Sequence, residues 1–337
     1  MKTLTLLTPL LLLLLLCSCH ASEKKSPVTA AAQSAPYELL VVADKDWLHT
    51  PAGKSLLDIV EAPVEVLPQY EPCFRCTKIN PTAFNPTFKM YANIVFADVD
   101  SRHRQAEMRI NRNAYCRPQL IVYLNAPDDQ AFAELMQSRR EQIISLFNEQ
   151  EFSRERRLLA KTYSGTVMQQ AQKQFGVSIL APKDIDQVKE GTDFFWASAG
   201  RQEFRLNICI YTLPLSDLTP DQFVAARDSV MKANIPGGTD GQWMETDSRT
   251  VTARLQPATD TQPARMQVYG LWDMRNDAMG GPFVSYIQKD ERHQRLLVTE
   301  GFVFAPQEKK RPLIRQLEAA LQTLSYAAPA KPQHTHL

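Results

Sequence analysis

The sequence lacks the short motifs that most often mark an active site. It contains no GxSxG elbow, no Walker A phosphate loop, no GxGxxG turn and no HExxH pair. Long runs of lysine and arginine are also missing, and the formal net charge is only +1. We therefore predict no nucleic-acid partner and no cofactor, and the motifs identify no catalytic residue.

Histidine is scarce as well, with six residues in the chain. Half of them lie near the chain ends, in segments that we expect to be loose: His20, His334 and His336. The other half are far apart in the sequence, so only the fold could bring them into a catalytic triad: His49, His103 and His293. Two histidines in the C-terminal tail could bind a metal, but an unstructured tail is the simpler interpretation, and we predict no metal site.

Long apolar runs are absent except at the N-terminus. Lys2 supplies one positive charge, and the apolar stretch from Leu4 to Leu16 ends in seven consecutive leucines. This pattern is typical of a secretory signal peptide, and the run is shorter than the ~20 residues that a transmembrane helix needs. We therefore predict that residues 1–18 are a signal peptide.

The apolar run ends at Leu16-Cys17-Ser18-Cys19, which resembles the lipobox of bacterial lipoproteins. The resemblance implies that Cys19 carries a diacylglycerol thioether and becomes the mature N-terminus. Cys17 fits less well, because the bulky Leu16 would occupy the small-residue position before it. Two or three acyl chains, such as palmitate, would hold the protein on a membrane, since each buried methylene contributes about 0.8 kcal/mol. The alternative is a plain secretory signal that leaves Cys19 as a thiol.

The segment after Cys19 has no apolar periodicity. Residues 19–36 are a mixture of Ala, Ser, Gln, Pro and a few charges, which predicts a flexible tether. Fully stretched at about 3.5 Å per residue, it reaches roughly 60 Å from the membrane. His20 replaces the Asp of an inner-membrane sorting signal, so resemblance to the usual sorting rule favours the outer membrane. The lack of an acidic run favours its periplasmic face.

Four cysteines remain in the body of the protein: Cys73, Cys76, Cys116 and Cys209. An envelope compartment permits disulfides, and four cysteines allow three pairings that the sequence cannot distinguish. The spacing of Cys73 and Cys76 is that of a thioredoxin-like redox motif, but such a motif starts at a helix N-terminus. Residues 77–81 instead indicate a strand that is about to end, and a second CxxC for zinc is missing. We expect structural or free thiols.

The first half of the body alternates strand and helix signals. We expect strands at 37–43, 74–79, 94–99, 108–111 and 120–124. The last run has no polar interruption, which is typical of a central strand. Thr50 and Pro51 indicate the start of a helix that continues to about Val60. Helical spacing then extends from Asp128 to about Gln174, and we expect a break near residues 148–153.

The second half of the body has strand and helix signals in a similar order. We expect strands at 194–196, 206–211, 266–272, 283–287 and 296–304. Helices begin at Thr219, which forms a capping box with Gln222, and at Pro312. We predict an α+β fold of two lobes, each a mostly antiparallel sheet packed with helices, in an order that a duplication would produce. The lobes are residues 37–176 and 177–326, and residues 327–337 form a loose tail.

Seven of the 12 glycines fall between Gly237 and Gly301. Neighbouring glycines permit unusual backbone conformations and let a ligand come close. Aromatic and acidic side chains accompany them, a mixture that can bind a sugar or a peptide. The candidate ligand-binding residues are Trp243, Trp272, Asp273, Asp277, Gly280, Gly281 and Phe283. The alternative, which we favour, is a tight turn between two strands with tryptophans in the core.

Several segments carry a resemblance to one family. They are Glu71-Pro72-x-Phe74, Gly270-Leu271-Trp272, Met279 to Phe283, Gly301 to Pro306, Lys310-Arg311 and Arg315 to Ala319. These segments are similar to a family of Bacteroidota envelope lipoproteins, domain of unknown function 4837. The resemblance covers nearly the whole mature chain, implies an envelope lipoprotein and assigns no activity. The cysteine pair at 73 and 76 is not part of the family pattern.

Two functional hypotheses follow. The leading one is a non-enzymatic envelope lipoprotein that binds a partner protein or a cell-wall or glycan ligand. It depends on the missing catalytic motifs and on the aromatic, glycine-rich segment. The alternative is a hydrolase that acts on a cell-wall or glycan substrate through carboxylates such as Asp273, Asp277 or Glu300. Two carboxylates facing each other in a cleft would favour the hydrolase.

The substitution Cys19→Ser tests the membrane anchor. We expect the variant to leave the membrane fraction or to accumulate as an unprocessed precursor, because serine cannot form the thioether. Immunoblots of membrane and soluble fractions measure this, and Cys17→Ser is the matched control that stays anchored. A correctly cleaved Cys19→Ser protein that remains on membranes would show that the anchor lies elsewhere.

Overall fold

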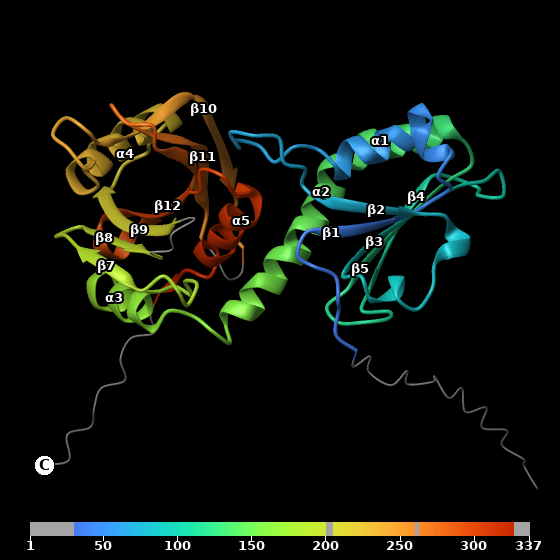
Figure 1. Cartoon of the computed structure of the whole chain (residues 1–337), viewed down its shortest axis with the longest axis horizontal. Helices are drawn as coiled ribbons and strands as arrows, with labels where there is room; N and C mark the ends of the chain where they lie inside the picture. Colours follow the sequence, from blue (N-terminus) through green and yellow to red (C-terminus); the bar gives the residue numbers. More distant parts are fainter. Residues whose placement is uncertain (1–29, 200–204, 260–262, 327–337) are drawn as a thin grey trace, which may run out of the picture.

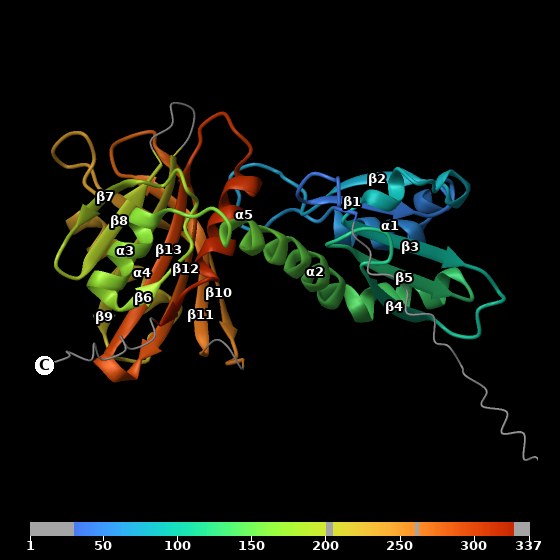
Figure 2. The same ribbon diagram turned by 90° about the horizontal axis from the view of Figure 1, so that it is seen from below.

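The computed structural model describes residues 30–199, 205–259 and 263–326 (Figure 1). The predicted signal peptide, Cys19, most of the tether and the C-terminal tail lie outside these residues, as do His20, His334 and His336. The described chain forms two lobes connected by one long helix, α2, which Figures 1 and 2 show running from the first lobe to the second. No described helix is both long and apolar enough to cross a membrane.

The first lobe is built on a five-stranded sheet with the order β2-β1-β3-β5-β4. The pairs of β1 with β2, β1 with β3 and β3 with β5 are parallel, whereas β4 runs antiparallel to β5. The strands are β1 (Glu38–Val42), β2 (Arg75–Ile79), β3 (Asn93–Val99), β4 (Glu107–Arg112) and β5 (Leu120–Ala126). Three short 3-10 turns lie between them, at Trp47–His49, Pro81–Ala83 and Phe88–Met90.

Helices α1 (Pro51–Val60) and α2 (Asp129–Leu159) cover one face of this sheet. The Thr50 side chain accepts a hydrogen bond from the Gly53 N–H at 3.2 Å, with proline at the first helical position. The predicted N-cap of α1 is therefore confirmed. The opposite face is covered by aromatic side chains, most of them from the loops between strands.

The second lobe is built on a seven-stranded antiparallel sheet with the order β10-β11-β12-β13-β9-β8-β7. Its strands are β7 (Gln187–Glu190), β8 (Phe194–Ser198), β9 (Arg205–Pro214), β10 (Met244–Gln256), β11 (Arg265–Met274), β12 (Gly280–Asp290) and β13 (Arg295–Phe304). A small sheet pairs β6 (Val177–Ser178) with β14 (Ser325–Tyr326), and a 3-10 turn occupies Glu291–His293.

Helices lie on both faces of the large sheet. The helices α3 (Gly165–Phe175) and α5 (Lys310–Leu321) pack on one face, and α4 (Pro220–Asn234) packs on the other. Strand β9 serves both cores by alternation, since Ile208 faces α3 and α5 while Cys209 faces α4. The predicted capping box of Thr219 and Gln222 at the start of α4 is present.

The α+β architecture with two lobes is confirmed, but the first sheet is mostly parallel and not antiparallel. Its strands are joined by long connections such as α1 between β1 and β2, and parallel pairs need such crossovers. Continuous burial of Leu39 to Val42 and of Leu120 to Val122 is also typical of parallel strands. Because the two sheets have different topologies, the structure contradicts a duplication.

The predicted break in the long helical segment is wrong in position. Helix α2 continues through residues 148–153, because Glu151 and Phe152 are buried there and not part of a loop. Glu151 accepts hydrogen bonds from Asn93 Nδ2 at 2.6 Å and from the Tyr37 N–H at 3.0 Å. The break falls at residues 160–164, and α3 packs in the core of the second lobe. The boundary between the lobes therefore precedes α3, whereas we place it at residue 176 from the sequence.

A buried ion pair fixes α4 on the large sheet. Arg227 of α4 and Glu300 of β13 are both fully buried, and Arg227 Nη2 lies 2.7 Å from Glu300 Oε1. Glu300 also accepts a hydrogen bond from Ser285 Oγ at 2.8 Å. The guanidinium of Arg227 lies 3.9 Å from the centroid of the Phe283 ring. These contacts satisfy two charges that would otherwise be costly to bury.

We expect Glu300→Gln to lower the free energy of unfolding by about 3–5 kcal/mol, because it removes the fully buried counter-charge of Arg227 and leaves only the partly exposed Asp228, whose Oδ1 lies 3.4 Å from Arg227 Nη1. Urea unfolding followed by circular dichroism measures this. The double variant Arg227→Met/Glu300→Leu should regain most of the loss, since an apolar pair needs no counter-charge. A loss below about 1 kcal/mol in the single variant would show that the pair is not structurally important.

Candidate functional site

The sequence-predicted binding residues lie on the β11–β12 hairpin and beside it, but they do not converge on one cavity. Trp272 and Phe283 are each 1% exposed, and Trp272 Nε1 donates a hydrogen bond to the Val303 carbonyl at 3.2 Å. Asp273 and Asp277 are exposed at the end of the hairpin. The favoured interpretation of this segment, a turn between two strands with tryptophans in the core, holds for Trp272 and not for Trp243.

Trp243 lies apart from Trp272 and is only partly buried. Its ring is flanked by two cations, Lys232 Nζ at 4.0 Å and the Arg275 guanidinium at 4.7 Å from the ring centroid. Such contacts cover an aromatic surface with charged side chains. They leave Trp243 packed between neighbours at the end of β11.

The glycines of this segment make room for neighbouring groups of the protein. A Cβ at Gly281 would lie 2.0 Å from the Val303 carbonyl oxygen, and one at Gly270 would lie 2.5 Å from the Phe283 ring. Gly280 would place a Cβ 2.7 Å from a carboxylate oxygen of Asp273. Close packing of neighbouring groups explains these glycines, so their presence does not require a ligand that comes close to the backbone.

The carboxylates of the hydrolase hypothesis do not face one another in a cleft. Glu300 is sealed beneath α4 and bound to Arg227, whereas Asp273 and Asp277 face solvent. The body histidines do not meet either: His103 lies 2.8 Å from Asp98, and His293 lies 2.8 Å from Asp290. Among the described residues, no three His, Cys, Asp or Glu side chains are grouped closely enough to hold a metal ion.

The cysteines show no sign of redox activation. All four in the described part of the chain are free thiols, and Cys73 and Cys76 lie just before and within β2. Burial raises the pKa of both thiols above the ordinary value. A raised pKa disfavours the reactive thiolate. Neither cysteine lies at a helix N-terminus, which agrees with the interpretation of structural or free thiols.

The lobes meet at a joint that the sequence alone does not reveal. We call it the interlobe joint; it consists of α2, α5 and the linker of residues 61–74 between α1 and β2. Glu71 of the linker is 4% exposed and accepts hydrogen bonds from the backbone N–H groups of Lys310 at 2.7 Å and Arg311 at 3.1 Å. A side chain of the first lobe thus caps the N-terminus of α5 in the second.

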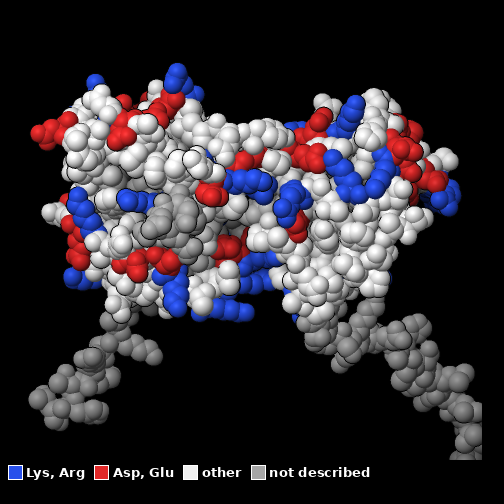
Figure 3. Space-filling model, viewed as in Figure 1, with Lys and Arg blue, Asp and Glu red and all other residues white. Residues whose placement is uncertain are grey.

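Further contacts from the linker strengthen the interlobe joint. Gln69 Oε1 accepts a hydrogen bond from Lys310 Nζ at 3.1 Å, and Glu65 forms an ion pair with Arg254 of β10. Leu67 packs against the hydrophobic cores of both lobes. Figure 3 shows acidic and basic side chains gathered along the waist between the lobes.

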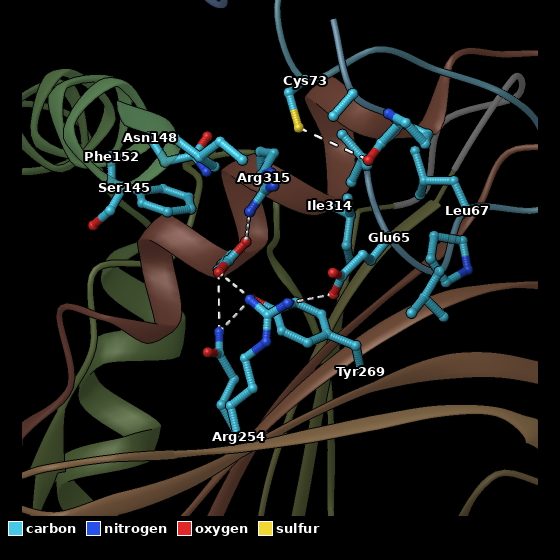
Figure 4. A pocket seen from close by; sticks show the side chains of 18 of the residues that line it. Glu65, Leu67, Cys73, Ser145, Asn148, Phe152, Arg254, Tyr269, Ile314 and Arg315 are labelled. Carbon is cyan, nitrogen blue, oxygen red and sulfur yellow. Dashed lines mark hydrogen bonds and ion pairs between the residues drawn. The ribbon is translucent and has the colours of Figure 1, made fainter. Parts of the chain in front are cut away.

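A cavity of about 490 Å³ opens at this joint, and we call it the joint cavity. Both lobes supply its walls through the linker, α2, β10, β11 and α5 (Figure 4). Its volume falls within the range of small-molecule sites. The polar and aromatic residues that line it include Glu65, Arg140, Ser145, Asn148, Phe152, Arg254, Gln256, Gln267, Tyr269, Arg315, Glu318 and Gln322.

A buried polar network forms one wall of the joint cavity (Figure 4). Glu318 of α5 is 3% exposed and accepts hydrogen bonds from Tyr269 Oη at 2.5 Å, Gln267 Nε2 at 3.0 Å and Arg315 Nη1 at 2.8 Å. Burial, together with the Glu318 charge, raises the pKa of Tyr269 well above the ordinary value. The phenol therefore stays protonated and serves as a fixed donor. Asn148 Oδ1 is buried and has no hydrogen-bond partner within the described residues.

Five residues of the interlobe joint lie in segments that carry the sequence resemblance. Glu71, Lys310, Arg311, Arg315 and Glu318 are all in those segments, and the fold brings them together from positions about 240 residues apart. The sequence offered one signal for the joint, namely that charged residues recur in several of these separate segments. Sequence reasoning missed it because the glycine-rich hairpin was locally more unusual.

The fold and the joint define a two-lobe α+β protein with a ligand-sized cavity between its lobes. Residues 164–323 match the family model described as Domain of unknown function (DUF4837), and residues 32–160 match another, Domain of unknown function (DUF8532). The second lobe of this chain is therefore similar to the DUF4837 family. The resemblance implied coverage of nearly the whole mature chain. The match to DUF4837 covers the second lobe alone, so the implied coverage is wrong.

Other comparisons add little to these two matches. No curated protein matches the chain. Among solved structures, a point mutant of protein Mog1 aligns with a TM-score of 0.28 at 9% identity, covering 45% of this chain and 91% of that one. The Ran-binding protein Mog1p of Saccharomyces cerevisiae aligns with a TM-score of 0.27 at 9% identity, covering 45% and 90%. At these TM-scores the likeness indicates neither fold nor function.

Proposed function

We propose that this protein is a lipid-anchored component of the bacterial envelope that binds a small polar ligand in the joint cavity without transforming it. The observation that carries the proposal is a cavity with walls from both lobes and a fixed set of hydrogen-bonding groups. The ligand class that suits these groups is a glycan or peptide fragment, because both present hydroxyl or amide groups.

The cellular location in this proposal depends on the sequence of the N-terminus. The apolar run and the lipobox-like Leu16 to Cys19 support a diacylated or triacylated Cys19. His20 at the following position supports the outer membrane, and the lack of an acidic run supports the periplasmic side. A Bacteroidota origin is proposed on the resemblance of the same family segments.

The chemistry of the joint cavity supports binding more than hydrolysis. Four of its charged side chains are held in pairs, Arg254 with Glu65 and Arg315 with Glu318. Paired charges supply orientation and specificity at a binding site. Amide and phenol groups from Gln256, Gln267 and Tyr269 lie among them and can donate or accept hydrogen bonds. No observation on the described residues favours the carboxylates of the hydrolase hypothesis.

Isothermal titration calorimetry with defined probes tests the proposal. The probes are chitotriose, a disaccharide–peptide fragment of peptidoglycan, and trialanine, each titrated into the full chain. Ser145 is an exposed residue of α2 that lines the joint cavity, so Ser145→Trp should obstruct the cavity without disturbing the core. We expect saturable binding of at least one probe, weakened at least about tenfold, or ~1.4 kcal/mol, by Ser145→Trp.

The matched control is Ser138→Trp, because Ser138 is exposed on the same helix and does not line the joint cavity. This variant should bind with unchanged affinity. Equal affinity in the Ser145→Trp protein would place the binding site elsewhere, and no saturable heat with any probe would oppose this ligand class.

A further inference from the structure

A second cavity, of about 660 Å³, adjoins the interlobe joint at the start of α5. We call it the α5 cavity; it shares Arg315 with the joint cavity and is otherwise lined by different residues. Both lobes contribute to it. Its lining includes Tyr37, Tyr70, Glu71, Arg75, Glu151, Arg154, Glu155, Leu158, Lys309, Arg311, Arg315 and Gln316.

Positive charge predominates in the α5 cavity. Five of its lining residues are Arg or Lys and three are Glu. Most of the cations are already paired: Arg75 with Glu38, Arg154 with Glu151 and Arg315 with Glu318. The carboxylate of Glu71 is also engaged, since it accepts the first N–H groups of α5. The third carboxylate, Glu155, accepts a hydrogen bond from Gln316 Nε2 at 3.2 Å, and burial raises its pKa, which disfavours its charged form. Lys309 and Arg311 remain as cations, and within the described part of the chain their side chains form no ion pair.

Arg311 is a cation with unused donors. Its Nη1 donates to the Pro72 carbonyl, whereas its Nε is buried and has no hydrogen-bond partner among the described residues. Burial lowers the pKa of Arg311 from the ordinary value, so the charged form lacks full compensation where it lies. The guanidinium also lies 5.7 Å from the centroid of the Tyr37 ring. A buried donor without a partner is costly, and because Nε is enclosed, a ligand in the α5 cavity would bind the terminal nitrogens of this guanidinium.

We propose that the α5 cavity is a phosphate-binding site in which Arg311 and Lys309 hold the oxyanion. A guanidinium offers parallel N–H donors that match two phosphate oxygens, and a lysine ammonium adds a second charge. Two unpaired cations match the two charges of free phosphate or of a phosphomonoester. The joint cavity and its polar ligand are not required for this site, so the two proposals can fail separately.

Thermal unfolding of the full chain, titrated with inorganic phosphate at constant ionic strength, tests the site. We expect a saturable rise in Tm, because phosphate binds the folded state only. Arg311→Gln should abolish the rise, Arg311→Lys should weaken it, and Arg109→Gln should leave it intact. Arg109 is a matched control, since it is an exposed arginine on β4 that does not line the α5 cavity.

Two further arms identify the source of the phosphate and guard against misfolding. Dimethyl phosphate represents the phosphodiester of a lipid headgroup. A larger rise in Tm with dimethyl phosphate than with inorganic phosphate would support a site for a lipid headgroup. A smaller rise would support a site for free phosphate. If Arg311→Gln does not fold, Lys309→Gln replaces it, because Lys309 is exposed and unpaired within the described residues. No saturable shift, an equal shift with acetate, or an undiminished shift in these variants overturns the proposal.

Discussion

The carboxylate of Glu71 joins two parts of the chain that are 239 residues apart at their closest hydrogen bond. The N-cap residue of α5, Lys309, supplies no side-chain acceptor, so the first N–H groups of the helix need another partner. Glu71 provides it from the first lobe, and its negative charge suits the positive end of the helix dipole. The linker that carries Glu71 also brings Leu67 into contact with both cores. One capping interaction thereby couples the orientation of two sheets that share no strand.

Both cavities depend on this coupling. The joint cavity needs the linker to lie over β10 and β11, and the α5 cavity needs the start of α5 to face Tyr37 and Arg75. The shared helix α2 supplies a common wall, because it packs on α1 in one lobe and on α5 in the other. Charges that would repel or remain unpaired in separate lobes are thus paired across the interface, as with Arg254 and Glu65.

Local features of this fold were predictable from the sequence, and long-range ones were not. The caps at Thr50 and Thr219 depend on a few neighbouring residues, so their positions were read correctly. The direction of the first sheet depends on how its connections cross, and the continuity of α2 depends on Glu151 being bound by Asn93 and Tyr37. The joint was missed because Glu71 and α5 are neighbours only in the folded chain. The hairpin was overvalued because glycines that allow tight packing resemble glycines that surround a ligand.

Native-state hydrogen exchange of the Lys310 and Arg311 amides tests the role of Glu71 most directly. Removal of a helix cap typically costs about 1 kcal/mol, so Glu71→Ala should speed exchange at these two amides by roughly fivefold. The exposed pair of Glu65 and Arg254 contributes at most about 1 kcal/mol, and Glu65→Ala should leave the same amides unchanged. Unchanged exchange at Lys310 and Arg311 in the Glu71→Ala protein would show that this carboxylate does not hold the lobes together.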